Sequence, residues 1–138
     1  MNTMTELKLK NPDSEKITIN LGPIDLGQID LLVSEGFYAN RTDLIRTAIR
    51  NQLNIHAEVV RQTVARKSLV LGMHHYSRAD LEAALESGHR LQIQVLGMAS
   101  IASDVPVELA LATIESIFVL GALHASTALK TALASRMR

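Results

Sequence analysis

The chain has 138 residues, enough for one ordinary domain or two small ones, and its 14 basic residues balance its 14 acidic ones. This balance excludes a strongly basic composition, so any contact with nucleic acid would depend on where charges lie locally. The absence of cysteine excludes disulfides, thiolate metal ligands and cysteine nucleophiles, and with only 3% aromatic residues the core must be aliphatic.

The N-terminal residues carry no targeting signal that we recognise. No apolar run follows the first residues, and no apolar stretch reaches 18 residues, so we expect neither a signal peptide nor a membrane span. This pattern is typical of a cytoplasmic protein. Residues 1–15 are polar, and we expect them to form a flexible arm.

Residues 16–21 alternate polar and apolar side chains, which predicts a β-strand. Its polar side chains are Lys16, Thr18 and Asn20, and its apolar ones are Ile17, Ile19 and Leu21. Because so short a strand is unstable alone, we expect it to pair antiparallel with the same strand of a second copy around a two-fold axis. A two-stranded ribbon has the right width for the major groove of DNA, where lysine, threonine and asparagine can contact base edges.

Two helices are predicted after this strand. Asp25 is the expected N-cap of the first, and Gly36 suits the left-handed position that ends it. Asn40 is the expected N-cap of the second, and Asp43 completes a pair that resembles a capping box. The apolar stripe of the second helix runs past Leu53 to about residue 66, since no proline or glycine interrupts it.

The stretch "KITINLGPIDLGQIDLLVSEGFYANRTDLIRTAIRNQL", residues 16–53, resembles the ribbon-helix-helix family of the CopG type. The resemblance implies a homodimeric, sequence-specific regulator of transcription, most often a repressor, whose ribbon enters the major groove. It also implies a location on the nucleoid. By the same resemblance the base-contacting residues would be Lys16, Thr18 and Asn20, and backbone N–H groups near Asn40, Arg41 and Thr42 would hold a DNA phosphate. Arg46 and Arg50 are interpreted as part of a solvated helix face.

The second half of the chain contains an internal repeat. "VLG" occurs at 70–72, 95–97 and 119–121, and a helical pattern with a start signal follows each copy. The start signals are Ser77, Asp104 and Ser126. Three strand–helix units of about 24 residues predict parallel strands, in a solenoid-like domain or in a compact three-stranded one. The predicted class is therefore α+β, with a DNA-binding and dimerisation domain at 16–67 and an α/β domain of three repeats at 68–138.

Several roles remain open for residues 68–138. The open edges of a three-stranded sheet favour self-assembly of dimers, and a sensing role competes with it. One hypothesis is a metal-responsive repressor, suggested by His74, His75 and His89. Adjacent histidines on a strand point to opposite faces, however, so we assign no metal or cofactor.

The chain as a whole also fits three further classes of DNA-binding protein. These are a plasmid partition or centromere-binding protein, a filament-forming DNA-binding protein and an antitoxin. The regular repeat at 68–138 argues against the antitoxin, whose tail is usually disordered. No catalytic motif is present, and we do not expect an enzyme.

Overall fold

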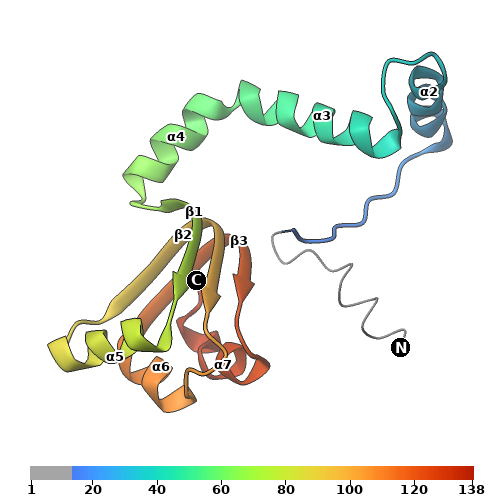
Figure 1. The fold of residues 1–138 in the computed structure, drawn as a ribbon. Coiled ribbons are helices and arrows are strands. Elements are labelled where there is room, and N and C mark those ends of the chain that lie inside the picture. Colours follow the sequence, from blue (N-terminus) through green and yellow to red (C-terminus); the bar gives the residue numbers. More distant parts are fainter. Residues whose placement is uncertain (1–13) are drawn as a thin grey trace, which may run out of the picture. The chain divides into compact units, whose positions relative to one another are not determined.

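The computed structural model describes residues 14–138, which divide into two units between Thr63 and Val64 (Figure 1). Most of the predicted arm, residues 1–13, lies outside the described residues. The described part is α+β, as predicted, with six α-helices and one three-stranded parallel sheet. No helix within it combines the length and apolarity needed to cross a membrane.

The first unit contains helix α2 (Pro23–Ser34), helix α3 (Arg41–Ile55) and most of helix α4 (Ala57–Arg66). The prediction that Asp25 caps α2 is wrong, because Gly22 is the N-cap and Pro23 occupies the first turn. Proline is pre-organised for that position, and Asp25 instead lies in the first turn, where the helix dipole favours a negative charge. Gly36 has a φ of +85°, which confirms the left-handed residue after α2.

Asn40 caps α3 as predicted, since its side-chain oxygen accepts a hydrogen bond of 2.8 Å from the N–H of Asp43. The Asp43 carboxylate in turn accepts from the N–H of Ala39, one residue before the position expected for a capping box. The expected uninterrupted helix to residue 66 is wrong. It breaks at His56, whose N–H bonds the carbonyl of Leu53 in the tighter i→i−3 pattern.

Residues 16–21 form no strand within the single chain. A strand requires hydrogen bonds to a neighbouring strand, and the predicted neighbour belongs to a second copy. The intermolecular ribbon therefore stays a prediction.

The second unit contains strand β1 (Val70–Tyr76), strand β2 (Leu91–Ile101) and strand β3 (Ile114–His124), in the order β1-β2-β3. All pairs are parallel, which confirms the prediction, and the three "VLG" copies lie side by side in register. Helices α5 (Arg78–Ser87), α6 (Val107–Thr113) and α7 (Thr127–Ala132) each follow a strand (Figure 1). The repeat found in the sequence is thus a repeat of structure.

The helix start signals of the second unit are partly confirmed. Ser77 closes a full capping box with Asp80, and the Ser126 hydroxyl accepts from the N–H of Leu129. Asp104 is not a cap, because Pro106 is the residue that precedes α6. Helix α6 is short, since β3 already begins at Ile114.

The core of the second unit lies between the sheet and its helices. Its central buried side chains are Leu81, Ile93, Val95, Ala99, Ala110, Ile114, Ile117, Leu129 and Leu133. They come from all three helices and from β2 and β3, but none comes from β1. Strand β1 therefore contributes least to the packing of this unit.

Candidate nucleic-acid interface

Two apolar side chains of residues 16–21 share a groove with helix α3. Ile17 and Ile19 line it together with Ile45 and Ile49 of α3, so these two residues face the helix. Ile17 nevertheless remains 76% exposed and Ile19 57% exposed. One chain covers only part of this apolar surface.

The first unit has no buried residue anywhere between Ser14 and Thr63. Large apolar side chains remain exposed along its helices and in the turn between α2 and α3, among them Ile24, Leu31, Phe37, Leu53, Ile55 and Val59. Exposed apolar surface of this extent marks an interaction site, because burial of such side chains is the main source of folding free energy. The residues of one chain are thus insufficient for a core in this unit.

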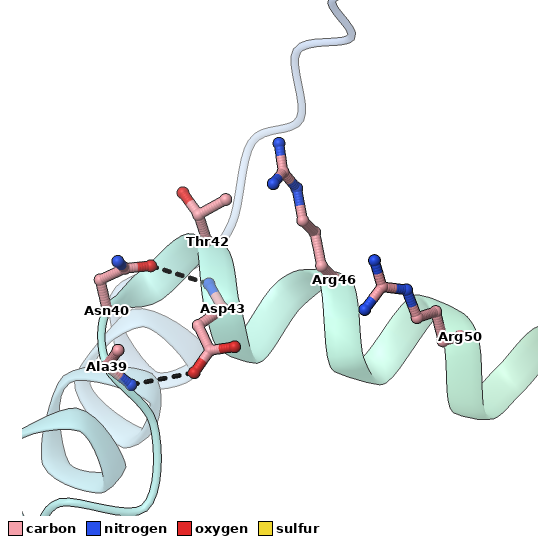
Figure 2. Close-up of a pocket in the computed structure, with 6 residues that line it drawn as sticks. All are labelled: Ala39, Asn40, Thr42, Asp43, Arg46 and Arg50. Atoms are coloured by element: carbon pink, nitrogen blue, oxygen red, sulfur yellow. Dashed lines mark hydrogen bonds between the residues drawn. The ribbon is translucent and has the colours of Figure 1, made fainter. Parts of the chain in front are cut away.

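The N-terminus of α3 gathers polar groups around one pocket, shown in Figure 2. Within the described residues the backbone N–H groups of Arg41 and Thr42 have no hydrogen-bond partner, while Asn40 occupies the N–H of Asp43. Free N–H groups and the helix dipole make such a terminus suited to a phosphate. The carboxylate of Asp43 lines the same pocket and opposes an anion there.

Arg46 and Arg50 also line this pocket, although the sequence favoured only a solvated helix face for them. Figure 2 shows Thr42, Arg46 and Arg50 projecting from one side of α3 beyond Asn40. Their spacing of four residues places them on one helix face. That spacing was the available signal, and the two guanidinium groups add positive charge that offsets Asp43.

The side chain of Arg41 has a different partner. Its Nε and Nη2 donate to the two carboxylate oxygens of Asp30 in α2, each at 2.8 Å. The hydrogen bond from Arg41 holds the pKa of Asp30 below its usual range. Arg41 therefore ties α2 to α3, and only its backbone N–H is available at the helix N-terminus.

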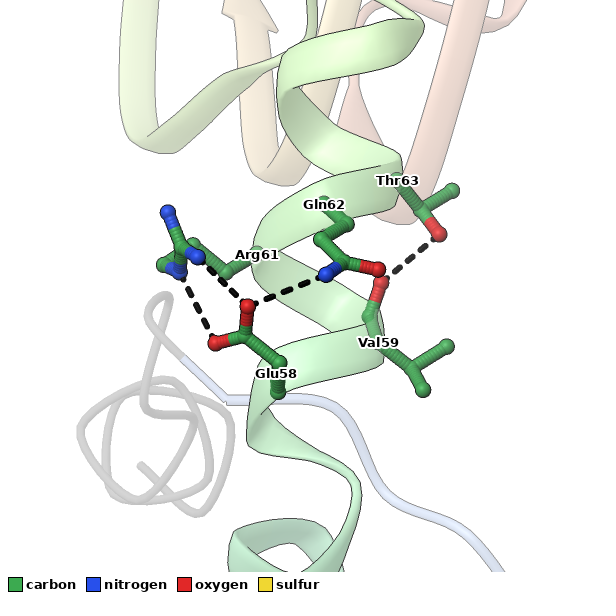
Figure 3. A network of polar contacts seen from close by, with 5 residues as sticks. All are labelled: Glu58, Val59, Arg61, Gln62 and Thr63. Carbon is green, nitrogen blue, oxygen red and sulfur yellow. Dashed lines mark hydrogen bonds and ion pairs between the residues drawn. The ribbon is translucent and has the colours of Figure 1, made fainter.

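Helix α4 offers a contrasting arginine, shown in Figure 3. Arg61 donates to both carboxylate oxygens of Glu58, and Gln62 donates to the same carboxylate at 3.1 Å. The hydrogen bond from Arg61 is the main cause that lowers the pKa of Glu58, and the one from Gln62 adds to it. Since its charge is already matched, Arg61 is less suited to hold a phosphate than Arg46 or Arg50.

The predicted base-contacting residues Lys16, Thr18 and Asn20 are all exposed. Lys16 lines the groove that also contains Arg46, whereas Thr18 and Asn20 line neither this groove nor the pocket at the start of α3. A single chain does not bring the three residues into a shared surface with a second strand. Their assignment stays a prediction.

The histidines of the second unit are arranged without a metal-binding cluster. In the part of the chain that the structure describes, no three side chains of histidine, aspartate or glutamate could hold a metal ion. Nδ1 of His75 lies 2.7 Å from the hydroxyl of Ser100, and the ring of His74 packs against Tyr76 at 4.4 Å.

Comparison with known proteins gives one match. The model of the Ribbon-Helix-Helix transcriptional regulator family matches residues 12–130, so the match extends over both units and beyond the resemblance at 16–53. Neither the curated proteins nor the solved structures gave a match.

Proposed function

The chain belongs to the ribbon-helix-helix transcriptional regulator family, and on this premise we propose that it binds double-stranded DNA sequence-specifically as a homodimer and represses transcription. Regulators of this family bind DNA and usually dimerise. The observation that carries the proposal is the first unit, which contains no buried residue between Ser14 and Thr63. A second copy would supply the surface that Ile17 and Ile19 lack.

In this dimer two copies of residues 16–21 pair antiparallel across the two-fold axis. Alternation places Ile17 and Ile19 toward α3, in agreement with the groove that they share with Ile45. Thr18 and Asn20 then face the DNA together with Lys16. Asparagine can pair with adenine through two hydrogen bonds, and lysine can donate to guanine or to a phosphate.

The start of α3 would position the dimer on the DNA backbone. The free N–H groups of Arg41 and Thr42 would donate to a phosphate oxygen, and Asn40 fixes the helix end that presents them. Arg46 and Arg50 extend this positive surface along α3. Phosphate contacts of this kind fix register and orientation, and they leave base recognition to the ribbon.

We assign residues 68–138 to assembly of the dimers. Strand β1 lies at the edge of the sheet and contributes no fully buried side chain to the core, so this unit retains surface for self-association. Joined dimers would bind adjacent sites with a high effective concentration, which offsets weak binding by each dimer.

Selection from a random pool of double-stranded DNA tests the proposed function. The full-length protein should enrich a short motif repeated about a two-fold axis, and its mass by light scattering should be that of a dimer or larger. Recovery of unselected sequences by a protein of monomer mass would contradict it. Enrichment of arrays of direct repeats would favour a partition or centromere-binding role instead.

A further inference from the structure

Strand β1 leaves apolar side chains uncovered on both of its faces. Val70 and Leu71 point to opposite faces because strand residues alternate, and they are 47% and 68% exposed. Val95, the neighbour of Val70 in β2, is fully buried. A layer stacked on one face of the sheet would cover only one of the two side chains. Another strand beside β1 would shield both, so this exposure favours pairing at the edge.

The central glycine of each repeat indicates which strand could pair with the free edge of β1. Gly72, Gly97 and Gly121 lie in one row and have φ values of +121°, +135° and +122°. A Cβ on Gly97 would overlap the carbonyl oxygen of Gly72, and a Cβ on Gly121 would overlap that of Gly97. The missing side chain of each of these two glycines thus leaves room for the backbone of the preceding strand. The same position on Gly72 has nothing within 4 Å among the described residues.

Among the described residues, Met137 and Arg138 contact the outer edge of β3 near its start. Met137 pairs with Ile117, and the N–H of Arg138 donates to the carbonyl of Ile117 at 2.9 Å. Ile117 lies two residues before Val119. Val119 is in register, across β2, with Val70, the first residue of β1. Among the described residues, these contacts lie two residues before the first row that a second β1 would pair.

The facing edges also match in charge. Residues 70–76 and 119–124 contain no aspartate, glutamate, lysine or arginine. They do contain histidines, and His75 of one copy would share a row with His124 of the next. With these histidines neutral, the two strands can pair without bringing like charges together or burying an unpaired charge.

We propose that the β1 edge of one copy pairs in parallel with the β3 edge of a second copy, with Gly72 beside Gly121. The carbonyl of Gly121 would then fit against Gly72 as the carbonyl of Gly72 fits against Gly97. Because the two edges are different surfaces, the contact repeats from copy to copy and forms a closed ring or a filament. This inference deepens the assembly role proposed for residues 68–138 and does not depend on DNA binding.

Cysteine cross-linking of the full-length chain tests this contact, since the chain contains no cysteine of its own. Met73, Met98 and Ala122 share the row next to the glycines, one on each strand. Adjacent strands lie about 4.8 Å apart, within the reach of a short thiol cross-linker. We expect a covalent dimer when Met73→Cys and Ala122→Cys proteins are mixed, and little product from either alone. The double variant should give a ladder of larger products.

Matched pairs distinguish this geometry from its rivals. Leu71→Cys mixed with Ala122→Cys is two residues out of register, about 7 Å along the strand, and should give less product. Efficient cross-linking of Met73→Cys alone would indicate two-fold pairing of β1 edges, and of Met98→Cys alone would indicate stacked sheet faces. Either result overturns the proposal, as does the absence of product from every pair. Circular dichroism of each variant checks that the fold is retained.

Light scattering separates failure of this contact from failure of the assembly role. Assemblies larger than a dimer without the Met73–Ala122 product would retain assembly and overturn this edge. Removal of residues 1–13 should leave the cross-linking yield unchanged. A rise in yield would identify that segment, rather than a second copy, as the occupant of the edge and overturn the proposal.

Discussion

At the scale of single residues, the candidate interface depends on which polar groups are already paired within the chain. Arg41 is bound to Asp30, and Arg61 is bound to Glu58. Arg46 and Arg50 have no ion pair among the described residues and lie beside the free end of α3. The arginines of the first unit therefore differ in their capacity to hold a phosphate, although the sequence alone presents them as equivalent.

Substitution of the proposed base-contacting residues should separate specificity from affinity. Asn20→Ala should cost about 1–3 kcal/mol at its base pair and relax specificity there, because a bidentate hydrogen bond is lost. Lys16→Ala should weaken binding to most sequences if Lys16 holds a phosphate. Titration of both variants on selected and on random DNA measures this difference, and an equal loss on both DNAs for both variants would contradict the assignment.

Substitution of Arg46 or Arg50 by alanine should weaken binding to selected and random DNA alike. Each lost phosphate contact should reduce the slope of log affinity against log salt by about 1, because fewer counterions are released. Arg61→Ala is the matched control, since it removes the same charge from a side chain already paired with Glu58. An effect of Arg61→Ala as large as that of Arg46→Ala would rule out a specific role for the pocket.

At the scale of elements, the glycine row determines how closely the parallel strands approach. Gly97 has a φ of +135° and faces the backbone of Gly72 directly, so a side chain there meets both conformational strain and backbone atoms that cannot move aside. The "VLG" repeat thus has a steric cause. At Gly97 and Gly121 the backbone of the preceding strand occupies the space that a Cβ would need.

Gly97→Ala should destabilise the protein by at least about 1–3 kcal/mol, the usual cost of a strained backbone conformation. Gly27→Ala is the matched control, because Gly27 lies inside α2 with nothing within 4 Å of its Cβ position among the described residues. Alanine inside a helix should instead stabilise by about 0.5–1 kcal/mol. Urea unfolding of both variants measures the two changes, and equal stabilities would contradict the packing of the row.

At the scale of the whole molecule, the two units differ in how they achieve stability. The second unit buries its own aliphatic core, whereas the described part of the first unit contains no fully buried residue. Packing of a second copy against Ile17 and Ile19 is therefore the expected source of stability for the first unit. The free energy of unfolding of this unit should then rise with protein concentration.

Ile19→Lys should abolish dimerisation of the first unit and binding to DNA, because it places a charge in the apolar groove beside Ile45 and Ile49. The second unit should remain folded, so the strand signal in circular dichroism and the Met73–Ala122 cross-link should persist. Thr18→Lys is the control for dimerisation alone, since the added charge points away from the groove and Thr18 is itself a proposed base contact. A dimer that survives Ile19→Lys with full DNA affinity would contradict the proposed ribbon.

The sequence by itself determined the features that arise from neighbouring residues. The cap of α3 at Asn40, the left-handed Gly36, the capping box at Ser77 and the three parallel strands in "VLG" register all follow from local periodicity or backbone chemistry. The family resemblance at residues 16–53 is also a local pattern, and the family match extends it over most of the chain.

Only the tertiary structure decided which groups come together from distant parts of the chain. It paired Arg41 with Asp30 and placed Met137 and Arg138 beside Ile117 of β3. The structure also shows a break in the long helix at His56, where the sequence has no proline or glycine from which to predict one. The two pairings depend on contacts between residues far apart in sequence, which no local pattern encodes. The exposed apolar surface of the first unit depends on how much surface one chain can bury without a second copy.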